Sequence, residues 1–129
     1  MRYNGQQIKI KLLQNQVFIA DKCYVAERFL ERFLGLMGRA QLSSGEGMLF
    51  PQCKSVHMWF MKIPIDIIFL NIDQANSDVT LRRISSLHQN VRPWKFIPVS
   101  DFGASEVLEL PAGTIQKNSL QVGDSLCIS

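Results

Sequence analysis

The stretch SVHMWFMKIPIDIIFLN, residues 55–71, places two strand-length apolar runs on either side of a proline. Residues 56–61 and 65–71 have no polar face, because large apolar side chains occupy both sets of alternating positions. A strand of this kind has to be covered on both sides. Pro64 cannot donate a ladder hydrogen bond, so we expect it at a strand end or a bulge. The stretch therefore predicts two strands buried within one core.

Several further short strands are predicted around this centre. Apolar residues alternate with polar ones over residues 7–12, and the turn residues 14–16 lead into a second strand at 17–20, which indicates a hairpin. Short apolar runs also predict strands at residues 47–50, 79–84, 106–110 and 125–128. Residues 85–104 are punctuated by Pro93, Pro98 and Gly103 and are expected to form a long loop. Ordered loops of this size usually cover or bind something.

Residues 22–37 change to a helical period. Apolar residues share one stripe from Ala26 to Met37, while Glu27, Arg28 and Glu31 face outward. Asp21 is the expected N-cap. The predicted fold class is a compact α+β domain, with a curved mixed or antiparallel β-sheet packed on this one main amphipathic helix. Closure of the sheet into a barrel is compatible with so many short strands, and residues 1–129 are expected to form a single domain.

Composition and charge restrict the classes of function. Hydrophobic residues make up 47% of the 129 and charged residues 19%, as in a globular protein. The net charge of +3 comes without a block of lysine and arginine, so no nucleic-acid partner is predicted. Asp66 interrupts the longest apolar run, which is therefore shorter than the ~18 residues that a membrane span requires. Residues 1–14 do not resemble a signal peptide. Three scattered cysteines suit reduced thiols, so a cytoplasmic protein is expected.

Asp66 and His57 are the two polar groups inside the apolar stretch. An unpartnered buried carboxylate would cost several kcal/mol, so Asp66 is expected to accept hydrogen bonds from backbone amides, a hydroxyl or an arginine such as Arg32 or Arg39. This structural role is favoured over catalysis, although both stay open. For His57 the alternatives are a hydrogen-bonded spacer and a base, and the spacer is again favoured.

Glu109 and Cys53 are the remaining candidates for chemistry. Glu109 precedes Pro111 at a strand end and could project into a cleft, where it would form an acid/base pair with Asp66 if the fold brought the two together. Cys53 and His57 are four residues apart, but one such pair is a weak metal signal. No metal site and no cofactor are predicted.

The order of motifs resembles the uncharacterised family of domain of unknown function 192, also called uncharacterised protein family 0127. The matching blocks, which span about residues 25–128, are RFLGLMGR (32–39), GEGMLF (45–50), VHMWFMKIPIDIIFL (56–70), RPWK (92–95), EVLELPAG (106–113) and VGD (122–124). Here only Ile63 separates Lys62 from Pro64, where many members carry an additional Asn-Thr. The resemblance implies a small β-rich domain and supplies no reaction. It places Arg32, Arg39, Asp66, Glu109 and Asp124 in the family pattern and His57 in a subgroup.

Three functions are carried forward as hypotheses. The first is a non-catalytic accessory or small-ligand-binding module, in which Trp94 stacks on a ring while Arg92 and Lys95 hold an anion; Arg32, Arg39 and His57 complete the predicted ligand site. The second is a hydrolase-like acid/base enzyme that uses Asp66 or Glu109, with His57 and an arginine stabilising charge. The third is a component of a protein assembly. The expected partner is thus a small ligand or a protein.

Overall fold

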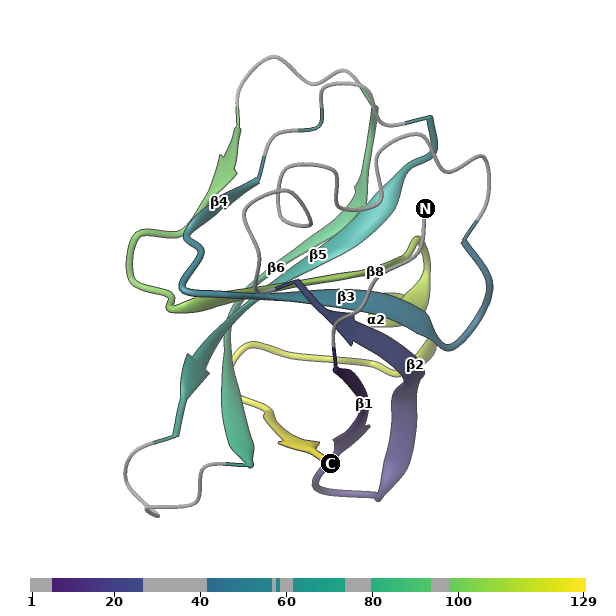
Figure 1. Ribbon diagram of the computed structural model, residues 1–129, viewed down its shortest axis with the longest axis vertical. Coiled ribbons are helices and arrows are strands. Elements are labelled where there is room, and N and C mark those ends of the chain that lie inside the picture. Colours follow the sequence, from purple (N-terminus) through teal and green to yellow (C-terminus); the bar gives the residue numbers. More distant parts are fainter. Residues whose placement is uncertain (1–5, 27–41, 57, 59–61, 74–79, 94–97) are drawn as a thin grey trace.

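A closed β-barrel forms the centre of the computed structural model (Figure 1), which describes residues 6–26, 42–56, 58, 62–73, 80–93 and 98–129. Around the barrel the strand order is β1-β2-β3-β8-β5-β6-β9, and β9 pairs with β1 to close it. The pairing of β2 with β3 is parallel, and the other pairings in the barrel are antiparallel. The barrel strands are β1 (Gln7–Leu12), β2 (Val17–Val25), β3 (Glu46–Pro51), β5 (Ile65–Ile72), β6 (Leu81–Val91), β8 (Glu106–Pro111) and β9 (Ser125–Ile128).

Alternating side chains fill the interior of the barrel. On β1, Ile8, Ile10 and Leu12 are buried, whereas Gln7 and Lys9 are exposed, as their alternation predicts. Inward-facing residues of the other barrel strands join them in one hydrophobic cluster, which is the interior core. The hairpin predicted at residues 7–12 and 17–20 is thus confirmed. The barrel-like alternative of the predicted fold class is confirmed with it.

The strand β5 is buried on both faces because it has a core on each side. Ile68 and Leu70 belong to the interior core. Ile67 and Phe69 point the other way, into a second cluster on the outside of β3, β5 and β8, which is the outer core. A two-stranded ribbon of β4 (Ser55–Val56) and β7 (Val99–Ser100) contributes to the outer core (Figure 1). The predicted two-sided burial of residues 65–71 is therefore confirmed for residues 65–70, which are all buried.

The strand predicted at residues 56–61 is confirmed in one position. Val56 belongs to β4, and Met58 is fully buried without regular secondary structure. Positions 57 and 59–61 lie outside the described residues. Pro64 directly precedes β5, as a residue that lacks a backbone donor should.

Part of the predicted loop at residues 85–104 is a strand. The strand β6 continues to Val91, because its backbone pairs with β5 along nearly its whole length despite the polar sequence of residues 85–90. A register shift in that pairing lies beside Ser85 and Ser86, and the hydroxyl groups of both serines donate to Oδ2 of Asp101, at 2.6 and 2.7 Å. Asp101 thereby ties the segment after β7 to the barrel wall.

The helix predicted at residues 22–37 is wrong at its start. Residues 22–25 belong to β2, where Cys23 and Val25 are buried between neighbours on β1 and β3. Pairing with two strands thus outweighs the local helical pattern, and Asp21 is a strand residue instead of an N-cap. Residues 27–41 lie outside the described part of the chain. Among the described residues the helix is the short α2 (Thr114–Lys117), and the barrel encloses the interior core with its own strands. The predicted packing of the sheet on a main amphipathic helix therefore has no support in the described part of the chain.

No helix among the described residues is long and apolar enough to cross a bilayer.

Candidate functional site

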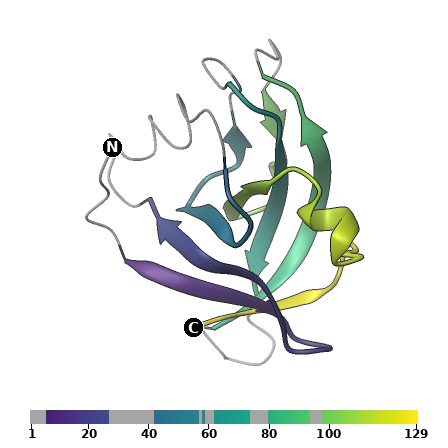
Figure 2. The same ribbon diagram turned by 90° about the vertical axis from the view of Figure 1, so that its right-hand side faces the viewer.

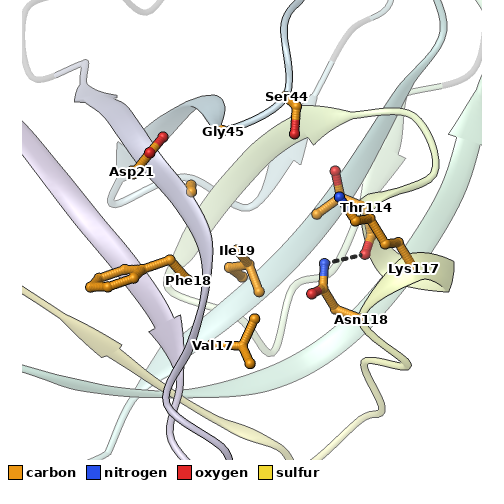
Figure 3. A pocket seen from close by; sticks show the side chains of 10 residues that line it. Val17, Phe18, Ile19, Asp21, Ser44, Gly45, Thr114, Lys117 and Asn118 are labelled. Carbon is orange, nitrogen blue, oxygen red and sulfur yellow. Dashed lines mark hydrogen bonds between the residues drawn. The ribbon is translucent and has the colours of Figure 1, made fainter.

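A groove of about 240 Å³ opens in the barrel wall between β2 and α2 (Figure 3). The strand β2 pairs with β3 from Lys22 to Val25, and the preceding part of β2 has separated from β3. The space between is bounded by α2 and by the turn that precedes β3. We call this space the β2–α2 groove; its lining consists of residues 17–21, Ser44, Gly45, Thr114, Lys117 and Asn118.

The two long walls of the groove differ in chemistry. Val17 and Ile19 supply apolar surface from β2, and Figure 3 shows Thr114, Lys117 and Asn118 facing them from α2. Thr114 Oγ1 donates to the backbone oxygen of Pro111 over 2.7 Å, and Asn118 Nδ2 donates to that of Thr114 over 2.9 Å. These bonds hold the polar wall in place. Lys117 is exposed and brings a positive charge to the rim.

One end of the groove is shaped by Gly45. Its carbonyl oxygen accepts hydrogen bonds from the backbone amides of Asp21 and Lys22, at 3.0 and 2.9 Å. Gly45 has φ +88, and a Cβ at this position would lie 2.3 Å from Oδ1 of Asp21. Glycine is therefore favoured chiefly by the backbone conformation, and an added Cβ would also displace the exposed Asp21 carboxylate.

Asp66 fixes the position of the helical wall. Its side chain is 0% exposed, with the parity of Ile68 and Leu70, which face the interior. The backbone amide of Asn90 donates to Oδ1 and that of Ile115, in α2, donates to Oδ2, both over 2.8 Å. The expectation that Asp66 accepts backbone amides is confirmed. Asp66 thus joins β5, β6 and α2, and it acts on the groove by positioning α2.

Glu109 is a second buried carboxyl group, on the other face of the sheet. It pairs with Ile67 of β5, which itself pairs with His88 of β6, so the three lie in one row across the strands. Glu109 is 5% exposed, and within the described part of the chain its Oε1 has no hydrogen-bond partner. Burial raises the pKa of Glu109 to about 8. Burial thus favours the protonated, neutral form of this side chain.

Asp66 and Glu109 do not form an acid/base pair. They lie on the adjacent strands β5 and β8, but their side chains point to opposite faces of the sheet. Asp66 points toward the interior core, and Glu109 lies on the face of Val107 in the outer core. Glu106, near the other end of β8, forms an ion pair with Arg82 across β5. Each of the three buried acids of this region has its own environment.

The predicted ligand residues fall mostly on undescribed positions. Arg32, Arg39, His57, Trp94 and Lys95 lie outside the described residues. Arg92 is described: it is exposed and follows the end of β6. The prediction that these six residues form a site therefore stays a prediction.

The remaining predicted positions have defined neighbours. Asp124 Oδ2 accepts the backbone amide of Gln121 over 2.9 Å, beside Gly123 with φ +93, which confirms its predicted role in a turn. Cys53 packs against the outer core whereas Asp66 faces the interior, so these two do not meet. Among the described residues, no three His, Cys, Asp or Glu side chains gather as a metal site would require.

The residues of the β2–α2 groove were missed by sequence reasoning. Thr114, Lys117 and Asn118 are ordinary polar residues of a short turn-rich segment, and nothing in their spacing is typical of a binding site. They become neighbours of Val17 and Ile19 only because the barrel closes. The sequence contains only an indirect signal for this groove. The resemblance placed Asp66 in the family pattern, and Asp66 anchors α2.

These features define a small β-barrel protein with a lateral groove between a strand edge and a short helix. The chain belongs to the family DUF192, described as Uncharacterized ACR, whose sequence profile matches residues 10–128. The match begins earlier than the residue 25 expected from the motifs.

Relatives and a solved structure agree with this assignment. The chain is 36% identical over 104 residues to a UPF0127 protein of Pyrococcus furiosus, covering 78% of this chain and 81% of that protein. It is 33% identical over 106 residues to a UPF0127 protein of Thermococcus sibiricus, covering 79% of this chain but 62% of that protein. A crystal structure of a protein of unknown function from Novosphingobium aromaticivorans superposes with a TM-score of 0.74 at 25% identity, covering 93% of this chain and 82% of the other.

Proposed function

We propose that this protein is a binding module whose small ligand occupies the β2–α2 groove. The observation that carries the proposal is a concave site with preformed walls. Thr114 and α2 are held by hydrogen bonds to the barrel, and Asn118 is held by a hydrogen bond to the backbone of Thr114. Ligand sites are usually concave and largely preformed, with a few fixed polar groups on an apolar lining. A non-catalytic role is favoured because the lining, as described, places no nucleophile beside a general base.

The lining indicates the chemistry of the ligand. The lining carries one ammonium group, of Lys117, and one carboxylate, of Asp21, which lies at the Gly45 end. Thr114, Ser44 and Asn118 offer hydrogen-bonding groups, opposite the apolar side chains of Val17 and Ile19. A carboxylate or another small anion would be held by Lys117, and a short apolar part of the same ligand would lie against β2. The proposed ligand is therefore a small amphipathic anion.

The test is a screen of small carboxylates by NMR with ¹⁵N-labelled protein. Binding in the groove should shift the amide signals of residues 17–21 and 114–118. Lys117→Ala should weaken the affinity about tenfold, which corresponds to the loss of one charge-assisted hydrogen bond. Lys54→Ala, which removes another exposed lysine outside the groove lining, is the control and should leave the affinity unchanged. Equal affinities of Lys117→Ala and Lys54→Ala would reject the groove as the ligand site.

The alternative ligand site predicted around Arg92 is separable in the same screen. If the site includes Arg92, Trp94 and Lys95, then Arg92→Ala should reduce binding and Lys117→Ala should not. Arg92 is exposed, so its replacement is not expected to unfold the barrel. A ligand that depends on Arg92 alone would move the proposed binding site from the groove to that segment.

Acid/base catalysis at Glu109 is the second candidate function. It is favoured by the buried carboxyl group whose pKa is raised to about 8 by burial, because a general acid must hold its proton at working pH. Asp66 is the weaker candidate, since both of its oxygens accept backbone amides. Turnover of a substrate panel that is abolished in Glu109→Gln but kept in Lys117→Ala would support an enzyme. Turnover that survives in Glu109→Gln would reject this candidate.

The cysteines and the net charge indicate the cellular compartment and the class of partner that we propose. All three cysteines are free, which supports a reducing compartment such as the cytoplasm. The mild net charge supports a ligand or protein partner over a nucleic acid. Residues 1–129 as one domain also stay a prediction; a single cooperative unfolding transition would support it, and two separated transitions would contradict it.

A further inference from the structure

The turn between β1 and β2 exposes a short segment that is both apolar and basic. Residues 13–18 are all exposed, whereas Leu12 and Ile19 on either side of them are buried. Figure 2 shows β1 and β2 running side by side to this turn, which lies at the margin of the molecule. Of the six large apolar side chains that are exposed in the described part of the chain, three belong to this segment: Leu13, Val17 and Phe18. We call residues 9–18 the β1–β2 tip.

Hydrogen bonds within the turn hold the tip in a fixed conformation. The backbone amide of Gln16 donates to the carbonyl oxygen of Leu12 over 2.9 Å, and its side-chain Nε2 donates to that of Leu13 over 2.8 Å. Oδ1 of Asn15 accepts the backbone amide of Val17 over 3.1 Å. A preorganised segment loses less conformational entropy when it enters an interface than a disordered one does. The exposed apolar side chains are therefore presented ready for contact.

Two lysines lie beside the aromatic ring of the tip. Nζ of Lys9 and Nζ of Lys11 are each 5.9 Å from the centre of the Phe18 ring. Lys11 is the cross-strand partner of Phe18, so these two side chains share the outward face of the hairpin. Among the described residues neither lysine forms an ion pair with a carboxylate, and the acid of β2, Asp21, lies beside Gly45. The tip thus combines exposed apolar surface with two unneutralised positive charges.

This combination fits the surface of an anionic lipid bilayer. There, apolar side chains enter the boundary between headgroups and acyl chains by about 5–10 Å, while lysines keep their ammonium groups among the headgroups. Leu13 lies two residues, or about 7 Å, beyond Lys11 along β1, so apolar and basic groups follow in the order of depth that a bilayer requires. A nucleic acid would neutralise the lysines but leave Leu13 and Val17 in water. Three half-exposed side chains are also too few for a stable protein interface, which takes about 800 Å² from each partner.

We propose that the β1–β2 tip docks on the surface of an anionic lipid bilayer. Its three exposed apolar side chains enter the interface, and the ammonium groups of Lys9 and Lys11 contact the anionic headgroups. The inference goes beyond the proposed ligand binding and does not depend on it. Because a few lysines and apolar side chains supply the whole attraction, the attachment is reversible and depends on salt and on lipid charge.

The test is co-sedimentation of the full-length protein with vesicles of phosphatidylcholine alone or with about one third phosphatidylserine. The native protein should bind the anionic vesicles at least about tenfold more tightly than the neutral ones, and about 0.5 M salt should release it. Phe18→Ser should weaken binding to the anionic vesicles about tenfold. Phe102→Ser, which removes a side chain that is 77% exposed outside the tip, is the control and should bind like the native protein. Equal effects of the two substitutions would overturn the proposal.

The lysines are tested with two double variants of equal net charge. Lys9→Gln combined with Lys11→Gln should remove most of the preference for anionic vesicles. Lys54→Gln combined with Lys62→Gln changes two exposed lysines outside the tip and should keep that preference. Circular dichroism checks that each variant is folded before vesicles are added. Equal losses in the two double variants would attribute the binding to net charge alone and overturn docking by the tip.

Insertion of the tip is measured separately from attachment. In Phe18→Trp, brominated acyl chains should quench the added indole on binding, beyond the quenching of the native tryptophans. Phe102→Trp should show no such excess. Attachment without excess quenching in Phe18→Trp would contradict entry of the tip into the interface. Absence of vesicle binding would overturn the proposal; lysine-dependent binding of duplex DNA would then assign the tip to a nucleic acid, and self-association lost in Phe18→Ser would assign it to a second copy of the chain.

Discussion

The backbone amide of Ile115 donates to Oδ2 of Asp66 over 2.8 Å, joining residues 49 positions apart in the sequence. Because the other oxygen of Asp66 accepts the amide of Asn90, one buried carboxylate ties α2 to β5 and β6. The groove wall that carries Lys117 depends on this link. One buried acid thus holds a wall of the β2–α2 groove in place.

Replacing Asp66 is expected to loosen α2 and destabilise the barrel. Asp66→Asn would place an amide donor against one of two backbone donors, which leaves a buried N–H unsatisfied, at a cost of about 2–4 kcal/mol in the free energy of unfolding. Urea denaturation measures this loss, and hydrogen exchange at the Ile115 amide should accelerate. Asp21→Asn, at an exposed carboxylate, is the control for stability. Equal stability of the two variants would contradict the positioning role.

Glu109 should make the protein less stable as pH rises. Burial raises its folded-state pKa from 4.5 to about 8, so the folded state holds a proton that the unfolded state has released between these values. The stability is then fully present below about pH 4.5 and falls up to about pH 8, with a slope of up to about 1.4 kcal/mol per pH unit. Glu109→Gln cannot ionise and should lose this dependence.

The measurement for Glu109 is the difference in unfolding free energy between the two proteins from pH 4.5 to 9. The free energy of unfolding of Glu109→Gln should rise relative to that of the native protein as pH increases, because the other titrating groups are common to both proteins. A constant difference across this range would show that Glu109 does not hold its proton in the folded state.

Gly45 is expected to be sensitive to an added side chain, chiefly through its backbone conformation. Its φ of +88 is strained for any other residue, and the added Cβ of alanine would collide with Oδ1 of Asp21. Gly45→Ala should therefore cost about 1–3 kcal/mol and weaken ligand binding in the adjacent groove. In Gly103→Ala the nearest atom would be 3.4 Å away, so this control should change stability much less. Thermal unfolding compares the two, and similar losses would contradict the prediction.

Cys23 should be chemically inert in the folded protein. It is 0% exposed, and burial raises the pKa of its thiol to about 12, so almost no thiolate forms at pH 8. Cys53 and Cys127 are half-buried. Iodoacetamide at pH 8 should modify Cys23 last, and only at the rate at which the barrel opens; mass spectrometry of digests reads this order. Rapid labelling of Cys23 without urea would indicate that the interior core is accessible.

Much of the strand pattern could be predicted because it is local. The alternation on β1 and the runs at residues 65–71 and 106–110 each state which faces are buried, and period 2 follows from strand geometry alone. The helical period at residues 22–25 failed because the same positions also satisfy a strand between two neighbours. The polar end of β6 was missed for the converse reason: backbone pairing with β5 holds it without an apolar face.

The sequence by itself determined that β5 is buried on both faces and that Asp66 needs buried partners, and it was compatible with a barrel, because burial and alternation are properties of each segment. Only the tertiary structure decided that the partners of Asp66 are the amides of Asn90 and Ile115, and that Glu109 faces the other way. It also decided that a groove lies between β2 and α2, where β2 is not paired with β3. These relationships join residues distant in sequence, and they follow from which strands pair when the barrel closes.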